Sequence, residues 1–156
     1  MSRKDYYNYE GAPKVNSIVA AASAVLTSKQ GNILLHKRRD NLQWSLIGGG
    51  MEYGESISET ILREIKEETG YDAHIEKMIG IYSNPKHVIA YSDGEVRQQF
   101  SICFHCIIDS GEGEISNESI QLRFFSRSEI EFLEIHESQK IRIKDYFENE
   151  ERAFIR

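Results

Sequence analysis

Glutamate is concentrated in one short window of the chain, just after three consecutive glycines, Gly48–Gly50. The window holds six glutamates and two basic residues: Glu52, Glu55, Glu59, Glu64, Glu67 and Glu68 against Arg63 and Lys66. It therefore carries four of the six net negative charges of the protein. Carboxylate oxygens are the ligands that Mg²⁺ and Mn²⁺ prefer, and glycine backbone groups suit a metal or a phosphate. The pattern indicates phosphate chemistry on a divalent metal ion.

Most of these glutamates lie on a predicted helix. A capping box opens residues 56–69, isoleucines recur at helical spacing, and Gly70 supplies a stop signal. At about 100° per residue, Glu64, Glu67 and Glu68 share one face that borders the apolar stripe, and the basic residues point elsewhere. Like charges beside a buried stripe repel one another, and partial burial adds to the cost. A bound cation would relieve this repulsion, whereas a solvated acidic face is the alternative.

The elements around this helix predict a mixed α/β domain. Strands are predicted at residues 17–27, 33–37, 73–82, 99–108 and 120–125. A short segment, residues 44–47, leads to the glycines, which indicate a tight turn or a close backbone approach. A brief helix is predicted at 126–133 and an amphipathic C-terminal helix at 137–156, with Ile143, Tyr146, Phe147 and Phe154 at helical spacing. Residues 1–16 form an arm or a short helix, and the long loop 82–97 is expected to face the substrate.

Length and composition restrict the class of protein. The 156 residues, about 18 kDa, fit one domain spanning 1–156, and 40% hydrophobic with 28% charged residues is typical of a soluble globular protein. The net charge of −6 argues against a nucleic-acid polymer as partner. Neither a bilayer-spanning apolar stretch nor a secretory signal is found, so no membrane partner is expected. Two cysteines exclude a disulfide scaffold and favour the cytoplasm; Cys103 and Cys106 should face opposite sides of a strand.

The spacing of the glycines and glutamates resembles a known motif. Gly49 is followed, after five residues, by Glu55, and after seven more residues by the run 63–70 (Arg-Glu-Ile-Lys-Glu-Glu-Thr-Gly). In these residues the chain resembles the Nudix box of Nudix (MutT-like) hydrolases. Two positions depart from the family pattern, Ile47 and Tyr71, and neither is a carboxylate. The motif residues are Gly49, Glu55, Arg63, Glu64, Glu67, Glu68 and Gly70.

The resemblance, which extends over about residues 17–133, implies a fold and a reaction. The fold is an α/β/α sandwich around a central mixed sheet. The reaction is cleavage of the pyrophosphate bond in a nucleoside diphosphate linked to another moiety, by water that Mg²⁺ or Mn²⁺ activates. Dimers are common among similar proteins, so a homodimer is also expected. Two alternatives stay open: a nucleotide-sensing Nudix-like module without catalysis, and a MutT-like housecleaning nucleoside triphosphate pyrophosphohydrolase.

The resemblance also implies roles for the motif residues. Glu64, Glu67 and Glu68 are expected metal ligands, together with the carbonyl oxygen of Gly49. Glu64 or Glu67 would act as base toward the attacking water. Arg63 would orient a glutamate of the motif, Glu55, rather than touch the substrate.

Three residues outside these positions are further candidates. Glu118, in an acidic loop, is expected as an extra metal ligand or base, and a solvated loop glutamate is the alternative. Arg38 resembles a phosphate-contacting arginine, with an ordinary strand end as the alternative. Glu52 is expected to contact the substrate. The histidines have no spacing that is typical of a site.

Overall fold

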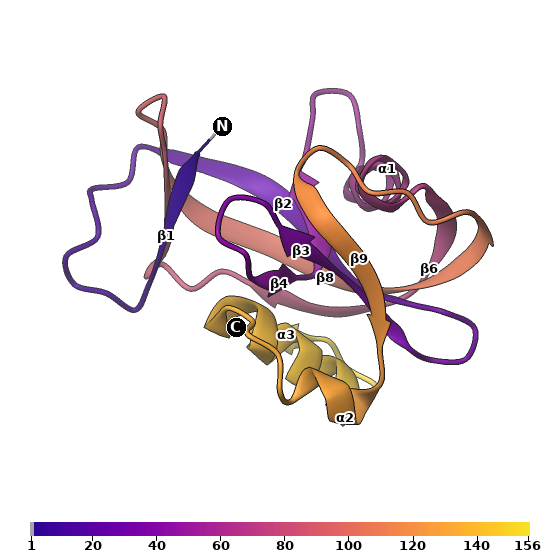
Figure 1. Cartoon of the computed structure of the whole chain (residues 1–156). Helices are drawn as coiled ribbons and strands as arrows, with labels where there is room; N and C mark the ends of the chain where they lie inside the picture. Colours follow the sequence, from indigo (N-terminus) through magenta and orange to yellow (C-terminus); the bar gives the residue numbers. More distant parts are fainter. Residues whose placement is uncertain (1) are drawn as a thin grey trace.

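Ten strands and three helices build the fold of residues 2–156, the part of the chain that the computed structural model describes. The strands are β1 (Arg3–Tyr7), β2 (Ser17–Thr27), β3 (Ile33–Arg38), β4 (Trp44–Ser45), β5 (Ile47–Gly50), β6 (Tyr71–Tyr82), β7 (His87–Tyr91), β8 (Val96–Gly111), β9 (Ser119–Phe125) and β10 (Phe154–Ile155). The helices are α1 (Ile57–Thr69), α2 (Arg127–Ile130) and α3 (Glu137–Glu148). Helix α1 covers one face of a mixed sheet, and α2 and α3 lie against the other (Figure 1). The predicted sandwich is confirmed.

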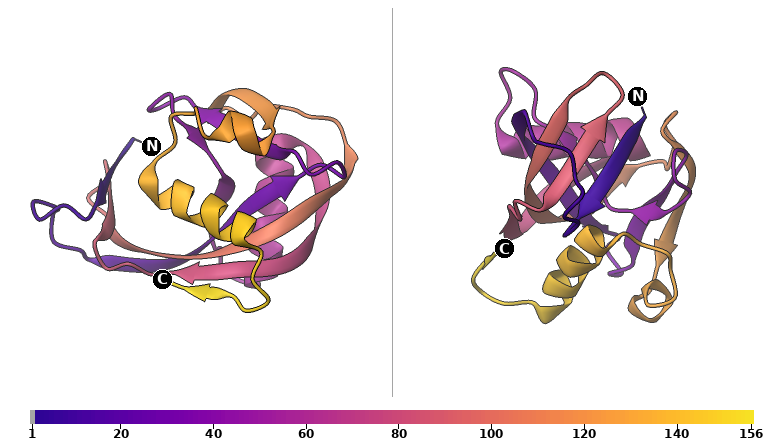
Figure 2. Two further views of the ribbon diagram at one scale, coloured as in Figure 1. Left: turned by 90° about the horizontal axis from the view of Figure 1, so that it is seen from below. Right: turned by 90° about the vertical axis from the view of Figure 1, so that its left-hand side faces the viewer.

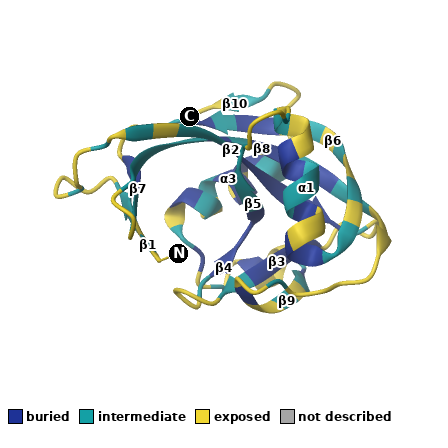
Figure 3. Ribbon diagram, turned by 90° about the horizontal axis from the view of Figure 1, so that it is seen from above, coloured by how far each residue is buried: buried dark blue, intermediate teal, exposed yellow. Residues whose placement is uncertain are grey.

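Two long strands, β2 and β8, run parallel through the middle of the sheet. The other edge of β2 pairs with β5 and β3, and the other edge of β8 pairs with β7 and β6. Figure 3 shows buried stretches of these strands at the centre of the molecule. Because β2 is covered on both faces, its sequence is a nearly continuous apolar run instead of an alternating one.

The two faces of the sheet carry separate apolar cores. On one side, Ile61 and Ile65 of α1 pack in a cluster that includes Cys106. On the other side, Ile143 of α3 packs in a cluster that includes Cys103. The two thiols are free, buried and on opposite faces, as predicted from strand geometry.

Helix α1 begins and ends as the sequence predicts. The hydroxyl of Ser56 accepts the N–H of Glu59 at 3.2 Å, and the Glu59 carboxylate accepts the N–H of Ser56 at 2.7 Å, which completes the capping box. Gly70 ends the helix in the left-handed conformation, with φ of 77°. Among residues 2–156, no helix combines the length and apolarity needed to cross a bilayer.

The predicted strands correspond to β2, β3, β6, β8 and β9, with longer bounds for β6 and β8. The predicted helix at 126–133 is shorter, because only Arg127–Ile130 is helical. The prediction of a turn at Gly48–Gly50 is wrong, since all three glycines lie in β5, which pairs with β2. The close approach is confirmed: a Cβ on Gly48 would lie 2.3 Å from the carbonyl oxygen of Ala22.

The N-terminal segment joins the sheet. Of residues 1–16, Met1 lies outside the described residues, and β1 pairs antiparallel with β7. The prediction of a loose arm or helix is wrong for residues 3–7, and the predicted loop 82–97 contains strand β7. Short strands with little apolar alternation depend on their neighbours for stability, so the local sequence does not reveal them.

The C-terminal segment contains a helix and then a strand. The predicted helix 137–156 ends at Glu148, where Asn149 takes a left-handed conformation with φ of 50°. Phe154 belongs to β10, which pairs in parallel with β6 (Figure 2). The terminal strand is tied back to α3 because the Arg156 guanidinium donates to Asp145 at 2.9 and 3.1 Å.

Candidate functional site

The carboxylates of α1 lie directly over the glycine strand β5. A Cβ on Gly49 would lie 2.3 Å from Oε1 of Glu64, so any side chain there would displace that carboxylate. Glu68, one helical turn on, is 6% exposed and accepts the N–H of Gly48 at 3.2 Å. The glycines are therefore required because acidic side chains of the helix occupy the space above them.

Arg63 connects the acidic residues at the start of the site. Its Nε lies 2.6 Å from Oε1 of Glu55, and its Nη1 lies 2.8 Å from Glu64 and 3.1 Å from Glu67. Its Nη2 donates to the carbonyl of Gly50 at 3.0 Å. The expectation that the basic residues point away from the glutamates is wrong for Arg63, because its long side chain folds back across the helix. The predicted contact with Glu55 is present, and it helps to lower the pKa of Glu55 to about 2.

Glu64 and Glu68 carry carboxylates that are costly to ionise. Burial raises the pKa of Glu68 well above its ordinary value, and the charges of Glu64 and Glu118 raise it further. Burial also raises the pKa of Glu64, although the neighbouring Arg63 opposes this effect. Negative charge is therefore packed together in a partly dry setting, where a cation would lower the electrostatic energy.

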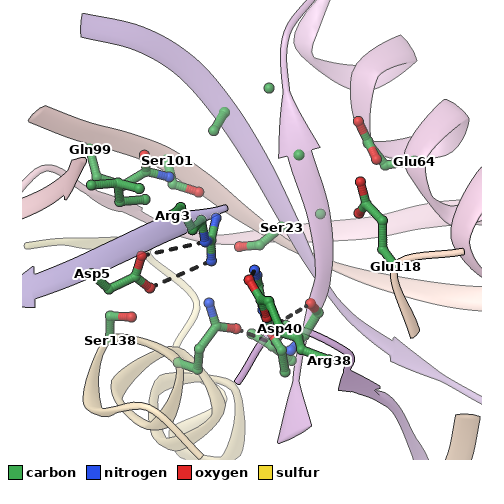
Figure 4. Close-up of a pocket in the computed structure, with 18 of the residues that line it drawn as sticks. Arg3, Asp5, Ser23, Arg38, Asp40, Glu64, Gln99, Ser101, Glu118 and Ser138 are labelled. Atoms are coloured by element: carbon green, nitrogen blue, oxygen red, sulfur yellow. Dashed lines mark hydrogen bonds and ion pairs between the residues drawn. The ribbon is translucent and has the colours of Figure 1, made fainter. Parts of the chain in front are cut away.

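Glu118 is brought to the same place from the loop before β9. Figure 4 shows its side chain pointing toward that of Glu64 at one end of the cavity. The loop is held because the N–H of Arg39 donates to the carbonyl of Glu118 at 2.9 Å. Four of the five predicted ligands therefore line one cavity: Gly49, Glu64, Glu68 and Glu118. Glu67 lies outside the cavity lining, its side chain 58% exposed beside Arg63.

The donor chemistry of this cluster fits a hard divalent cation. The side-chain groups offered are all oxygens, the carboxylates of Glu64, Glu68 and Glu118, and the glycines of β5 lie beside them in the cavity lining. Within residues 2–156, no three His, Cys, Asp or Glu side chains already converge in a metal-binding arrangement. Arg63 holds one oxygen of Glu64 at 2.8 Å, so side-chain rotations would accompany binding of an ion.

A cavity of about 650 Å³ extends from these carboxylates across the sheet. Strands β1 and β7 and the start of α3 form its far wall. Arg38 lines the cavity, and its Nε donates to Asp40 at 2.8 Å. Glu52 does not line it: its side chain is 68% exposed and lies 3.8 Å from Arg63. The predicted substrate contact of Glu52 is thus without support from this geometry.

Three residues of the far wall carry no signal in the sequence: Asp5 of β1, Gln99 of β8 and Arg142 of α3. His87 of β7 also lines this wall, and it belongs to the segment 82–97 that the sequence analysis expects to face the substrate. The four residues come from four elements that are distant in the chain. Arg142 lies on a helix face that is buried, at 3% exposure, where charged residues are not expected. No spacing pattern could have found them.

Acidification is expected to destabilise the protein through His36, which lines the cavity and contacts the Ser119 hydroxyl at 2.7 Å. Burial, with a smaller effect from the charge of Arg38, lowers the pKa of His36 to about 4. The unfolded chain binds a proton below pH 6.5 and the folded protein does not. The stability from the neutral ring is therefore complete above pH 6.5 and is lost as the pH falls toward 4. At about 1.4 kcal/mol per pKa unit, the loss reaches about 2–3 kcal/mol.

Denaturant unfolding of the wild type and His36→Gln at several pH values between about 4 and 7 checks this expectation. The variant cannot titrate at this position, so its stability should fall less steeply on acidification. His74→Gln is the matched control, since His74 is exposed and the Asp109 contact raises its pKa. Equal slopes for the wild type and His36→Gln would contradict the expectation.

Comparison with known proteins identifies the family. The NUDIX domain family matches residues 18–147. An ADP-ribose pyrophosphatase of Methanocaldococcus jannaschii is 33% identical over 135 residues, covering 81% of this chain and 72% of that protein. A Bacillus subtilis protein bearing the name of an 8-oxo-dGTP diphosphatase is 45% identical over 65 residues, covering 42% of this chain and 44% of that protein.

The fold also matches solved structures. The crystal structure of a NUDIX hydrolase from Nitrosomonas europaea has a TM-score of 0.75 at 20% identity, covering 91% of this chain and 79% of that one. This likeness shows a common fold. The chain spans less than half of the B. subtilis relative and nearly three quarters of the archaeal one. Together with the family match over most of its length, these similarities show that the chain belongs to the Nudix hydrolase family.

Proposed function

We propose that the protein hydrolyses the pyrophosphate bond of a nucleoside diphosphate linked to another moiety, with Mg²⁺ or Mn²⁺. The observation that carries the proposal is the meeting of Glu64, Glu68 and Glu118 at one end of a cavity of about 650 Å³. A cavity of this size suits a nucleotide derivative. Nudix hydrolases generally need divalent metal ions, and the named relatives are pyrophosphatases and diphosphatases.

The metal ion would be held by carboxylates of Glu64, Glu68 and Glu118, with the Gly49 carbonyl as a further ligand. When bound, a divalent cation neutralises pyrophosphate charge and makes a bound water more acidic. Glu67 is a weaker candidate ligand, since it lies outside the cavity lining beside Arg63.

The other residues of the site hold the reacting groups in place or accept a proton. Arg63 holds Glu64 through Nη1 at 2.8 Å, which fixes one carboxylate oxygen and leaves the other toward the cavity. Glu64 is our candidate for the base toward the attacking water, because its carboxylate lines the cavity, and Glu67 is the alternative. Glu55 stays ionised beside Arg63 and anchors its guanidinium. Arg38 at the cavity wall would contact a phosphate oxygen after leaving Asp40.

A substrate panel tests the proposal. Nucleotide sugars, ADP-ribose, dinucleoside polyphosphates, nucleotide coenzymes and normal or oxidised nucleoside triphosphates are incubated with Mg²⁺ or Mn²⁺. Phosphate release is measured with and without added phosphatase, which separates phosphomonoester products from inorganic phosphate. Turnover of nucleoside diphosphate derivatives is expected. Turnover of nucleoside triphosphates alone would favour the housecleaning alternative, and a raised melting temperature without turnover would favour the sensing alternative.

The domain organisation, the cellular location and the partners of the protein are also proposals. We propose a single Nudix domain over 1–156 that acts in the cytoplasm, which the two free, buried cysteines favour. Neither a nucleic-acid polymer nor a membrane is proposed as partner. A homodimer is proposed, and light scattering after size-exclusion chromatography would measure its mass.

A further inference from the structure

The far end of the cavity collects polar atoms without hydrogen-bond partners. Four buried side-chain atoms in residues 2–156 have no such partner: Oδ1 of Asp5, Nε2 of His87, Oε1 of Gln99 and Nε of Arg142. All four residues line the same cavity. Buried polar groups in native proteins are normally paired, because an unpaired group has lost its hydration without compensation. Their grouping at one place indicates a polar ligand.

Arg142 is the most unusual of the four. It is 3% exposed, and the one hydrogen bond of its guanidinium within the described chain joins Nη1 to the Ser23 hydroxyl at 3.1 Å. The guanidinium lies over the Tyr82 ring at 5.1 Å, and no carboxylate of residues 2–156 forms an ion pair with it. A buried cation without a counterion is costly, and an anionic ligand would remove that cost.

Other arginines that line the cavity are already compensated. Three of them have carboxylate partners: Arg3 with Asp5, Arg38 with Asp40, and Arg97 with Glu95. The exposed Arg39 donates to backbone carbonyls of the loop that carries Glu118. Asp5, which also lines the cavity, is neutralised by Arg3 at 3.4 Å. The unbalanced positive charge of the far end therefore belongs to Arg142.

His87 adds a ring nitrogen beside this charge, and the tautomer with hydrogen on Nε2 can donate it to an anion. Its ring packs against Tyr7 and stacks on His136 with centroids 6.0 Å apart, so its orientation is fixed. The ring is 6% exposed, and its unpaired Nε2 is available to a ligand in the cavity. The Ser23 hydroxyl, already bonded to Arg142, completes a group that suits the oxygens of an anion.

The two ends of the cavity favour bound groups of opposite charge. Figure 4 shows Gln99, Ser101 and Ser138 on the side away from Glu64 and Glu118. The carboxylates would repel an anion unless a metal ion is present, so the pyrophosphate belongs there with its cation. An anion at Arg142 must then be a different group of the same molecule.

We propose that Arg142, with His87 and Ser23, binds a second anionic group of the substrate, a phosphate monoester or carboxylate carried in addition to the pyrophosphate. This inference rests on the proposed function and makes its substrate class more specific: nucleoside diphosphate derivatives with an extra acidic group are preferred over their neutral counterparts.

Matched substrate pairs test the inference. NADPH with NADH differ by a phosphate monoester, and UDP-glucuronate with UDP-glucose differ by a carboxylate, so the pairs distinguish the two kinds of anion. The kcat/KM and the Kd of each member are measured for the wild type and for Arg142→Met, which keeps an unbranched apolar side chain. The wild type should prefer the acidic member of at least one pair by about tenfold or more. In Arg142→Met the ratio should fall to about one, because the loss falls on the acidic member of the pair.

Controls separate recognition from a structural role. Lys140→Met, an exposed change on the same helix, should keep the wild-type preference. The melting temperature of ligand-free Arg142→Met should equal or exceed that of the wild type, because an uncompensated buried charge is removed. A lower melting temperature with equal losses for both members of a pair would overturn the inference.

The outcome for this inference is separable from that for the proposed function. Turnover of both members without preference in the wild type would overturn the anion site and leave the hydrolase intact. Absence of turnover would overturn the proposed function, and the Kd ratios would still decide the site. Equal Kd values for acidic and neutral members would then count against it, and a preference that Arg142→Met abolishes would support it.

Discussion

Glu68→Gln is expected to lower kcat/KM by about 10³-fold while the protein stays folded. Glu68 lies on the buried face of α1, where its carboxylate is costly to ionise without a bound cation. The amide has nearly the same shape and can still accept the N–H of Gly48, but it is a poor metal ligand and carries no charge. The same change should leave the free energy of unfolding of the metal-free protein unchanged or higher, because a buried charge is removed.

Steady-state kinetics in Mg²⁺ and Mn²⁺, calorimetric titration with Mn²⁺ and denaturant unfolding measure these effects. Glu151→Gln is a matched control: it makes the same chemical change at an exposed position outside the cavity. Full activity of Glu68→Gln would remove the carboxylate cluster from the mechanism. Loss of activity accompanied by unfolding would assign Glu68 a structural role instead.

Gly49→Ala is expected to lower kcat/KM by about 10²-fold, because it displaces Glu64 by an ångström or more. The added Cβ would lie 2.3 Å from Oε1 and 2.4 Å from Cδ of Glu64. The side chain must rotate away, and it then loses its contact with Arg63 and its place in the cavity. The backbone of Gly49 is not left-handed, so alanine adds no conformational strain of its own.

The neighbouring glycines supply controls for this prediction. In Gly50→Ala the new Cβ meets its nearest atoms at 3.9 Å, so activity should stay within about threefold of the wild type. In Gly48→Ala the clash is with the carbonyl oxygen of Ala22 at 2.3 Å, so about 1–3 kcal/mol of stability should be lost. Equal activities of the Gly49 and Gly50 variants would show that Glu64 can move without cost, and would contradict its proposed role.

The relative positions of Glu64, Glu68 and the glycines can be predicted from the sequence because these residues are close together in the chain, whereas Glu118 comes from a distant loop. One helix with a capping box, an apolar stripe and Gly70 places Glu64 and Glu68 relative to the glycines that precede it. Strands β2, β3 and β8 are predicted for the same reason, since their apolar residues exceed what an exposed segment would carry. The resemblance to the Nudix box then indicates the protein family to which this local arrangement belongs.

The far half of the site depends on tertiary structure and is not predictable from spacing. His87 lies in β7, a segment whose sequence predicts a loop. Strand β7 pairs with β1, a segment without strand-like alternation. Arg142 appears on a helical wheel as an ordinary charged position, and only the folding of α3 against the sheet makes it buried. The sequence predicts a turn at the glycines of β5 because glycine is rare in strands. Gly49 is required there by Glu64, which lies 15 residues further along the chain and fills the space above it.

The most direct test of the account is product analysis of a nucleoside diphosphate derivative by phosphorus NMR in water enriched in oxygen-18. With Mg²⁺ or Mn²⁺, the wild type should release a nucleoside monophosphate and a phosphorylated second product. One of the two should carry a single heavy oxygen, and EDTA should stop the reaction. Bond cleavage that is unaffected by EDTA, or an intact pyrophosphate across the whole panel with both metals, would contradict the account.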